Sequence, residues 1–410
     1  MVYQWLKLQI VNHAPYTNWR IYADITGMDT ITLNTDSPAE SILSARRLVV
    51  KVGSAILVDE ASGAINRAWM DAFADDVAAC RARGQEVVIV TSGAVATGRC
   101  HLGLLGRPLK LEEKQAAAAT GQIRLAHAWQ EALARHALTV AQVLVTPEDT
   151  EARQRHLNGR ATINTLLRLG AIPLINENDT IATEEIRFGD NDRLAARVAQ
   201  MISADTLILL SDINGLYTAD PKKNPDAKLI ARVPDITPEI EAMADKPPPG
   251  FSSGGMITKI LAAKIALSAG CRMAIAMGRT PHPLEKMKSD PCTWFVPSTN
   301  PLSARKKWIA GHINPAGTFI IDSGAISALQ RGKSLLPAGV TAVTGTFERG
   351  DIVQVMTADG KEIARGLSAY SSDEATRIKG HQSAEIDQIL GEQGGRDVLI
   401  HRDDLVVLNV

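Results

Sequence analysis

Two lysines in this sequence stand beside glycine-rich turns, where an ammonium group can meet a phosphate. Lys51 lies inside the apolar run RLVVKVG, just before Gly53 and Ser54, and a lysine in an apolar strand is costly unless it reaches an anion. Lys259 closes SSGGMITK and is expected in the first turn of a helix. Such turns and helix starts bind phosphate. Taken alone, each lysine could equally be a solvated surface residue.

Asparagine, aspartate and glutamate cluster after another apolar run. NEND covers residues 176–179, and GDND follows at residues 189–192. Such side chains can hold the ammonium and carboxylate of an amino acid, or coordinate Mg²⁺ through water. Asp192 could orient the two lysines around a transferring group. Turns and helix caps are the ordinary explanation, but two dense clusters near a strand end favour a ligand site.

Two shorter polar runs also follow apolar runs. TSGA offers Ser92 as a hydrogen-bond partner for a carboxylate or phosphate, and Gly93 for close approach of the backbone to a ligand. LLSD ends in Ser211 and Asp212, which could line a nucleotide. By themselves, an ordinary helix N-cap and a plain loop explain these two runs better.

Lysines near phosphates, a carboxylate between them and no covalent nucleophile are consistent with phosphoryl transfer. This reaction mainly needs positioning and charge neutralisation, with Mg²⁺ bridging the phosphates. The sequence has no G-x-x-x-x-G-K-[ST] phosphate loop, no dinucleotide fingerprint after a strand and no G-x-S-x-G elbow. A nucleotide site must therefore be built differently, and spacing alone does not name the acceptor.

Apolar runs alternate with helical patterns over residues 46–300. This alternation predicts an α/β fold with a mostly parallel sheet sandwiched between helices. Strands are expected within residues 47–53, 86–94, 140–145, 171–179, 205–212 and 271–278. One helix is expected around Met70, Phe73 and Val77, whose spacing places them on one helix face. Further helices are expected over residues 112–136, 151–169, 190–203 and 256–269. The strand tails KVGS, TSGA, NEND, LSD and MGR should meet along one edge of the sheet, where ligands bind.

The remaining chain divides into three parts. Residues 1–45 lack periodicity and are expected to form an N-terminal extension, partly disordered, with Met28 as an alternative start. Residues 301–314 read as a linker or a short connecting helix. Short strands separated by turn signals then predict a smaller C-terminal domain, mainly β, over residues 315–400.

Composition bounds the class of protein. The net charge of -1 gives no overall attraction to nucleic acid or to an anionic membrane. The four cysteines show no zinc-ligand spacing, so reduced thiols and no protein-built metal site are expected. No apolar run is long enough to cross a bilayer, and the N-terminus lacks the pattern of a secretory signal. These features favour a soluble, cytoplasmic enzyme without a membrane partner.

Five motifs occur in an order and spacing that resemble the amino acid kinase family. They are VVKVGS, VTSGA, INENDTIATEEIRFGDND, LLSDINGLYTADP and SGGMITK, and the resemblance spans roughly residues 46–400. The chain is most similar to members that phosphorylate glutamate. That resemblance implies transfer from ATP to L-glutamate, giving L-glutamyl 5-phosphate, the first step of proline biosynthesis. It also implies a need for Mg²⁺, feedback inhibition by proline and a homo-oligomer.

The resemblance also assigns roles to residues. Lys51 and Lys259 match the family's phosphate-binding lysines, and Asp192 matches its organising aspartate. The positions that match the glutamate site are Ser92, Asn176, Asp179 and Asn191. The positions that match the ATP site, besides Lys51, are Ser211, Asp212, Ser253, Gly254, Gly255, Met256, Ile257, Thr258 and Lys259.

The C-terminal region resembles a PUA domain, through SLLPAGVTAVTGTFERGDIV. Because that domain is associated with RNA-modifying enzymes, it raises RNA binding as a second class of function. The region lacks a dense Lys/Arg run with interleaved aromatics, which disfavours RNA. Two alternatives stay open: a related kinase acting on aspartate, acetylglutamate, carbamate or a nucleoside monophosphate, and an RNA-binding protein on a decayed kinase fold. The intact set of Lys51, Asp192 and Lys259 argues against decay.

Overall fold

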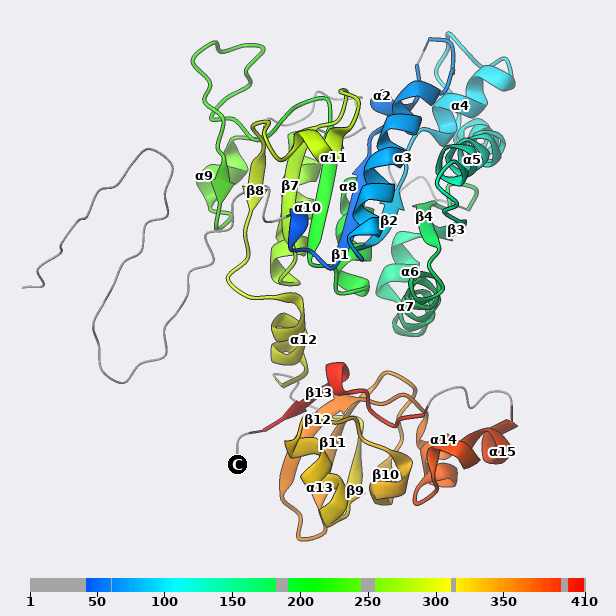
Figure 1. Ribbon diagram of the computed structural model, residues 1–410, viewed down its shortest axis with the longest axis vertical. Coiled ribbons are helices and arrows are strands. Elements are labelled where there is room, and N and C mark those ends of the chain that lie inside the picture. The colour runs from blue at the N-terminus through cyan, green and yellow to red at the C-terminus, as the bar shows by residue number, and fades with distance from the viewer. Residues whose placement is uncertain are drawn as a thin grey trace, which may run out of the picture.

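The computed structural model describes residues 42–59, 61–181, 191–244, 255–310, 315–391 and 397–408. These residues form an eight-stranded sheet covered by helices and, beyond α12 (Pro301–Ala310), a separate five-stranded sheet (Figure 1). The predicted fold class, a mostly parallel α/β sheet with a smaller mainly β C-terminal part, is confirmed. The exact domain limits of 46–300, 301–314 and 315–400 stay predictions.

Six strands of the larger sheet run parallel, and all six were expected from the sequence. In spatial order the eight strands are β3 (Val140–Val145), β4 (Ile172–Glu177), β2 (Glu86–Val90), β1 (Arg47–Val52), β5 (Thr206–Ser211), β7 (Arg272–Met277), β8 (Thr293–Phe295) and β6 (Arg232–Val233). The last two were not predicted, and β8 runs antiparallel to β7. Two- and three-residue strands leave too little periodicity to be recognised.

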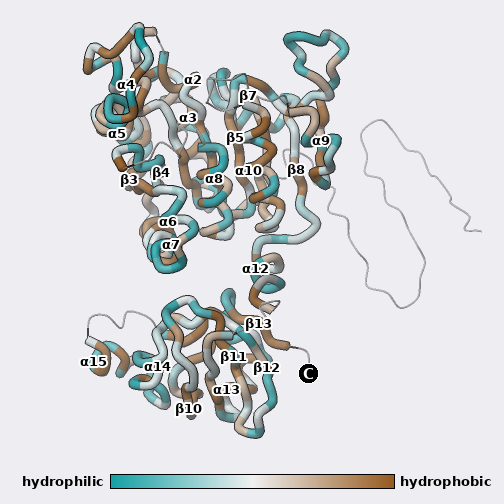
Figure 2. Tube along the Cα trace, turned by 180° about the vertical axis from the view of Figure 1, so that it is seen from behind, coloured by the Kyte–Doolittle hydropathy of each residue, from teal (hydrophilic) through white to brown (hydrophobic). Residues whose placement is uncertain are grey.

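Helices cover both faces of the larger sheet, as Figure 1 and the reverse view in Figure 2 show. One face carries α3 (Arg67–Ala82), α5 (Leu111–Ala134) and α11 (Pro283–Lys286), and the other carries α7 (Arg153–Arg168), α8 (Asn191–Met201) and α10 (Met256–Ser268). The shorter helices are α2 (Ser54–Leu57), α4 (Ala94–His101), α6 (Pro147–Glu151) and α9 (Pro238–Ala242). The helix expected near residues 151–169 is confirmed as α7, whereas α6, which an extended Ala152 separates from it, was not predicted.

Alternation along β1 decides where its lysine points. Val50 and Val52 pack into the core beneath α3 and α5, whereas Val49 packs on the opposite face beneath α8 and α10. Successive side chains of a strand point to opposite faces, so Lys51 shares the face of Val49. The lysine is therefore directed at the layer that contains α8 and α10.

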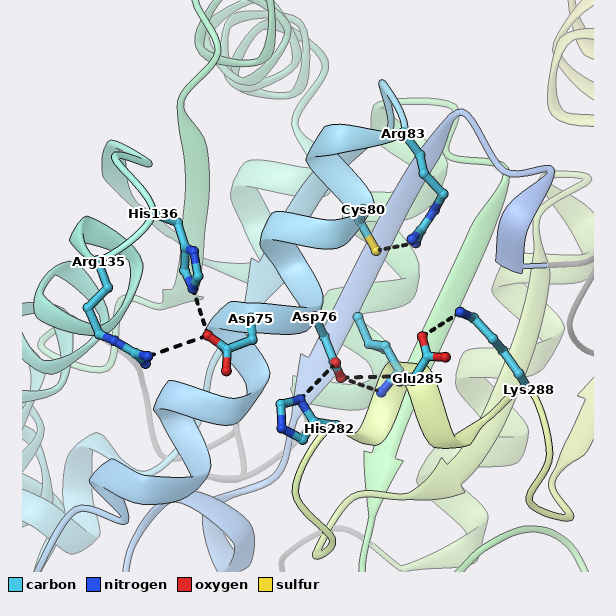
Figure 3. A network of polar contacts seen from close by, with 10 residues as sticks. Asp75, Asp76, Cys80, Arg83, Arg135, His136, His282, Glu285 and Lys288 are labelled. Atoms are coloured by element: carbon cyan, nitrogen blue, oxygen red, sulfur yellow. Dashed lines mark hydrogen bonds and ion pairs between the residues drawn. The ribbon is translucent and has the colours of Figure 1, made fainter.

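A buried carboxylate of α3 forms hydrogen bonds with the backbone of α11 (Figure 3). Asp76 accepts hydrogen bonds from the backbone N–H groups of Leu284 at 2.8 Å and Glu285 at 3.4 Å, and contacts the His282 ring at 3.3 Å. Burial raises the pKa of Asp76, and these donors offset part of that shift. The adjacent Asp75 bonds His136, just beyond α5, at 2.7 Å. Polar contacts therefore tie α3 to both of its neighbours.

Two glycines let α4 lie directly against α5. A Cβ atom on Gly98 would come within 1.8 Å of the Ala117 carbonyl oxygen, and one on Gly121 within 1.8 Å of the Ala94 carbonyl oxygen. The backbones can approach this closely only because neither residue has a side chain. This contact fixes α4, which was not predicted as a helix, at the carboxyl edge of the sheet.

The smaller sheet contains β10 (Val340–Gly345), β9 (Gly317–Ile321), β11 (Ile352–Thr357), β12 (Glu362–Leu367) and β13 (Leu405–Val407), in that order. It also carries three helices that were not predicted, α13 (Ser323–Gln330), α14 (Ser372–Ile378) and α15 (Ile386–Leu390). Asp404 joins it to the rest of the chain through ion pairs with Arg160 of α7 at 3.2 Å and Arg305 of α12 at 2.7 Å.

Three other expectations concern segments and thiols. Most of the predicted N-terminal extension, residues 1–41, lies outside the described residues. Ile42 and Ala45 are buried in the core of the larger sheet, so the end of that segment belongs to the fold. Cys80, Cys100, Cys271 and Cys292 form no disulfide, as expected. Across the described ranges, no helix has both the length and the apolarity required to cross a membrane.

Candidate active site

A cleft of about 650 Å³ opens at the carboxyl edge of the larger sheet. The ends of four parallel strands line it: Gly53 after β1, Ser92 after β2, Glu177 in β4 and Ser211 in β5. The fifth predicted tail, at residues 277–279, does not line it. Instead, the Gly278 carbonyl oxygen accepts a hydrogen bond from the Trp69 indole at 2.7 Å. Four of the five expected tails therefore meet at one cleft.

Lys51 and Lys259 line this cleft, and both contact the fully buried Asp192. The Lys51 ammonium lies 2.8 Å from Asp192 Oδ1, and the Lys259 ammonium lies 3.0 Å from Asp192 Oδ2. The first lysine comes from β1, the aspartate from the first turn of α8 and the second lysine from the first turn of α10. Asp192 and Lys259 thus both lie in the helical layer toward which the alternation of β1 directs Lys51.

The three charges are almost completely removed from water. Asp192 is 0% exposed, Lys51 is 7% exposed and Lys259 is 5% exposed. Burial by itself raises the pKa of Asp192, but the two ammonium groups more than offset it and hold that pKa well below its usual range. In the described part of this cluster, two ammoniums contact one carboxylate. Ammonium groups that line an open cleft are suited to a polyanion such as a triphosphate.

An amide network connects three of the predicted substrate residues. Asn191 Nδ2 lies within hydrogen-bond distance of the Thr91 carbonyl oxygen at 2.8 Å, Ser92 Oγ at 2.9 Å and Asn176 Oδ1 at 3.0 Å. Asn176 in turn donates to Gln122 of α5 at 2.6 Å. These bonds hold Ser92, Asn176 and Asn191 in fixed positions on the wall of the cleft, next to the lysine pair.

Asp179 is the fourth predicted substrate residue, and it also lines the cleft. Burial raises the pKa of this carboxyl to about 6. A carboxylate held partly out of water gains more from an ammonium partner than an exposed one does. Asp179 is therefore suited to the ammonium group of an amino acid.

Only some of the residues predicted to bind ATP line the cleft. Ser211 and Asp212 line the cleft, and the Ser211 hydroxyl donates to Asp212 at 3.2 Å. Thr258 donates to Asp192 Oδ2 at 2.9 Å, beside Lys259. Gly255 caps the start of α10 and is exposed, whereas Met256 and Ile257 pack partly against the core. Ser253 and Gly254 lie outside the described residues.

Comparison with known proteins assigns the chain to a family. The model of the amino acid kinase family matches residues 46–277. The chain belongs to the amino acid kinase family. The PUA domain model matches residues 317–390. The chain is 61% identical over 367 residues to the glutamate 5-kinase of Paramagnetospirillum magneticum, covering 89% of this chain and 99% of that protein.

A second relative agrees with this assignment, whereas a solved structure adds little to it. The chain is 57% identical to the glutamate 5-kinase of Allorhizobium ampelinum, across 90% of this chain and 94% of that protein. The solved structure of carbamate kinase from Giardia lamblia bound to AMP-PNP is 15% identical, covers 62% of this chain and 100% of that chain, and has a TM-score of 0.45. That match is too loose to extend the family assignment.

The described residues of this kinase contain no group of three or more His, Cys, Asp or Glu side chains that could hold a metal. The carboxylates that line the cleft belong to Glu177, Asp179 and Asp212, whereas Asp192 is occupied by the two lysines. Mg²⁺ usually keeps several waters and binds one or two carboxylates together with substrate phosphates. The donor set therefore fits a Mg²⁺ ion held mainly by a bound nucleotide.

Sequence reasoning missed two cations of the cleft. Arg99 of α4 and Lys114 of α5 both line the cleft, in addition to Lys51 and Lys259. Neither belongs to a strand tail, which was the signal used to select site residues. Because α4 was not predicted, its helical spacing from Ser92 to Arg99 could not be used to place the arginine.

Proposed function

We propose that this kinase transfers the terminal phosphoryl group of ATP to the side-chain carboxylate of L-glutamate, giving L-glutamyl 5-phosphate and ADP. The observation that carries the proposal is the buried Lys51–Asp192–Lys259 cluster, whose two lysines line the same cleft as the amide network and Asp179. The relatives named glutamate 5-kinase support glutamate as the acceptor. The product would be an acyl phosphate, formed in the first step of proline biosynthesis.

The two lysines would act on the phosphates. Lys51 and Lys259 have three N–H donors each, so each can bind a phosphate oxygen while keeping its contact with Asp192. Negative charge on the transferring group and the leaving ADP would be stabilised by fixed ammoniums in a site with little water. Ser211 and Asp212 would contact the nucleotide, together with the residues predicted for ATP at 253–259.

The acceptor would lie against the amide wall. Ser92 would donate to the reacting carboxylate, because its hydroxyl accepts a bond from Asn191 and keeps its own O–H for the cleft, and Asn191 would hold Ser92 in that position. Asn176 and Asp179 would receive the ammonium group. This arrangement directs a carboxylate oxygen at the phosphoryl group that the lysines hold, and positioning of this kind is the main requirement of the reaction.

Four further expectations accompany the proposed reaction. Mg²⁺ would enter bound to ATP, and it would supply charge neutralisation at the phosphates. The family resemblance supports proline as a feedback inhibitor and a homo-oligomeric state. The four cysteines without disulfides support a reducing, cytoplasmic location. Titration with Mg²⁺ and with proline, and sedimentation at several protein concentrations, test the first three.

A coupled ADP-release assay across acceptors tests the reaction. L-Glutamate, L-aspartate, N-acetyl-L-glutamate, carbamate and UMP are supplied separately with Mg·ATP. The proposal predicts a strong preference for L-glutamate in kcat/KM. Similar rates with several acceptors, or a preference for another one, would contradict it.

Trapping the product identifies the carboxylate that reacts. Hydroxylamine converts an acyl phosphate into a hydroxamate, so the proposed product gives the γ-hydroxamate of glutamate. Mass spectrometry distinguishes this from the α-hydroxamate through its fragments. An ATP-dependent α-hydroxamate would overturn the side-chain assignment.

A further inference from the structure

One face of α4 forms part of the cleft wall. Val95, Ala96 and Arg99 line the cleft, and their spacing places them on the same side of a helix. Arg99 lies roughly 9 Å along the helix axis from Gly93, which caps the helix beside Ser92. Arg99 therefore lines the cleft at a position further along α4 than the Ser92 turn.

The Arg99 side chain is fixed by carbonyl groups rather than by a carboxylate. Its Nη2 donates to the Leu104 carbonyl oxygen at 3.3 Å and to the Arg107 carbonyl oxygen at 3.1 Å. Among the residues placed by the structure, no acidic side chain lies within ion-pair distance of it. A guanidinium has five N–H donors, so two carbonyl contacts leave it able to bind an anion.

The charges of the cleft match the charges of the acceptor. Glutamate carries a reacting carboxylate, an ammonium and a second carboxylate. Lys51 and Lys259 are committed to Asp192 and to the phosphates, and Asp179 suits the ammonium. The other cationic side chains that line the described cleft are Arg99 and Lys114. Of these two, Arg99 keeps the N–H donors of Nη1 for an anion, because its carbonyl contacts use only Nη2.

We infer that Arg99 binds the α-carboxylate of the acceptor and thereby selects glutamate over γ-carboxylates that lack this group. The inference rests on the proposed function, since it concerns the distal end of the same substrate. The close contact of Gly98 with Ala117 makes α4 rigid at this point.

The test compares two substrates in four proteins. L-Glutamate and L-isoglutamine, whose α-carboxylate is an uncharged amide, both keep the reacting γ-carboxylate. Steady-state kinetics are measured for the wild type, Arg99→Met, Arg99→Lys and the control Arg124→Met, which removes an exposed arginine from α5. Arg99→Met should lower kcat/KM for glutamate roughly 10- to 100-fold, with KM for ATP unchanged and isoglutamine turnover little affected. Arg99→Lys should recover part of the loss, and Arg124→Met should have no effect.

The outcomes separate the inference from its alternatives. An equal loss with both substrates would overturn it, because Arg99 would then only hold the loop that contains Leu104 and Arg107. Unchanged glutamate kinetics in Arg99→Met would overturn it as well. Wild-type protein that releases no ADP with glutamate would instead remove the proposed function. Thermal unfolding of each variant shows whether the fold is kept.

Discussion

Lys51 and Lys259 bind the two oxygens of one buried carboxylate, at 2.8 Å and 3.0 Å from Asp192. The fold itself therefore holds the two ammoniums close together, as a site for negative charge. Ordering two long side chains costs conformational entropy, and here that cost is met on folding rather than on binding. A preorganised site of this kind stabilises charge without reorganising during the reaction.

Lys259→Ala should lower kcat by about 10²–10³-fold, because the variant loses one of the fixed charges at the transferring group. The matched control is Lys264→Ala on the same helix, whose ammonium pairs with Glu241 on the surface at 2.7 Å. The control should keep normal turnover. ADP release under saturating substrates measures both. Full activity in Lys259→Ala would remove this lysine from the mechanism.

Asp192→Asn should destabilise the protein without ligand and increase its response to nucleotide. The substitution removes the charge of the carboxylate that both buried ammoniums contact, at a cost of about 3–5 kcal/mol. A bound triphosphate replaces the missing charge. The rise in melting temperature with a non-hydrolysable ATP analogue should therefore be larger in the variant than in the wild type. A smaller rise would show that phosphates do not approach these lysines.

The pH dependence of kcat/KM for glutamate should report the protonation of Asp179. Its pKa is raised to about 6, so the carboxyl is neutral below that pH and cannot pair with an ammonium. We expect kcat/KM for glutamate to be constant well above pH 6 and to fall about tenfold per pH unit below it, since kcat/KM reports groups of the free enzyme. Asp179→Asn should lower the plateau and abolish this descending limb. A limb that persists in the variant would assign the titration to another group.

Gly98→Ala should destabilise the protein by about 3 kcal/mol, because the new methyl group would overlap the Ala117 carbonyl oxygen. Gly159→Ala in α7 is the matched control. A Cβ there meets only Met201, at 3.6 Å, so the better helix propensity of alanine should leave stability equal or slightly higher. Chemical denaturation compares the two variants. Equal stabilities would show that α4 and α5 are less closely packed than described.

The strands were predictable because buried parallel strands are continuous apolar runs. The strand expected at 140–145 has the observed bounds of β3, and the polar tails of β1, β2, β4 and β5 do meet at one cleft. Residue types could also suggest that Lys51, Asp192 and Lys259 act together. Their direct contact depends on β1 alternation and on the placement of α8 and α10 over one face, which the strand pattern implies.

Other features depend on contacts that no local pattern contains. Gly98 and Gly121 are unremarkable within a helical sequence, and their importance arises only where two helices touch. Arg99 reaches the cleft because that contact fixes α4, so its role follows from packing rather than from a motif. The antiparallel β8 is similar, since three residues acquire their direction from β7 and β6.

A crystal structure with Mg²⁺ and a non-hydrolysable ATP analogue tests the central claim most directly. The account predicts that the ammoniums of Lys51 and Lys259 both lie within hydrogen-bond distance of the β- or γ-phosphate oxygens, with Asp192 still between them. Phosphates bound elsewhere, with both lysines contacting only Asp192, would contradict it.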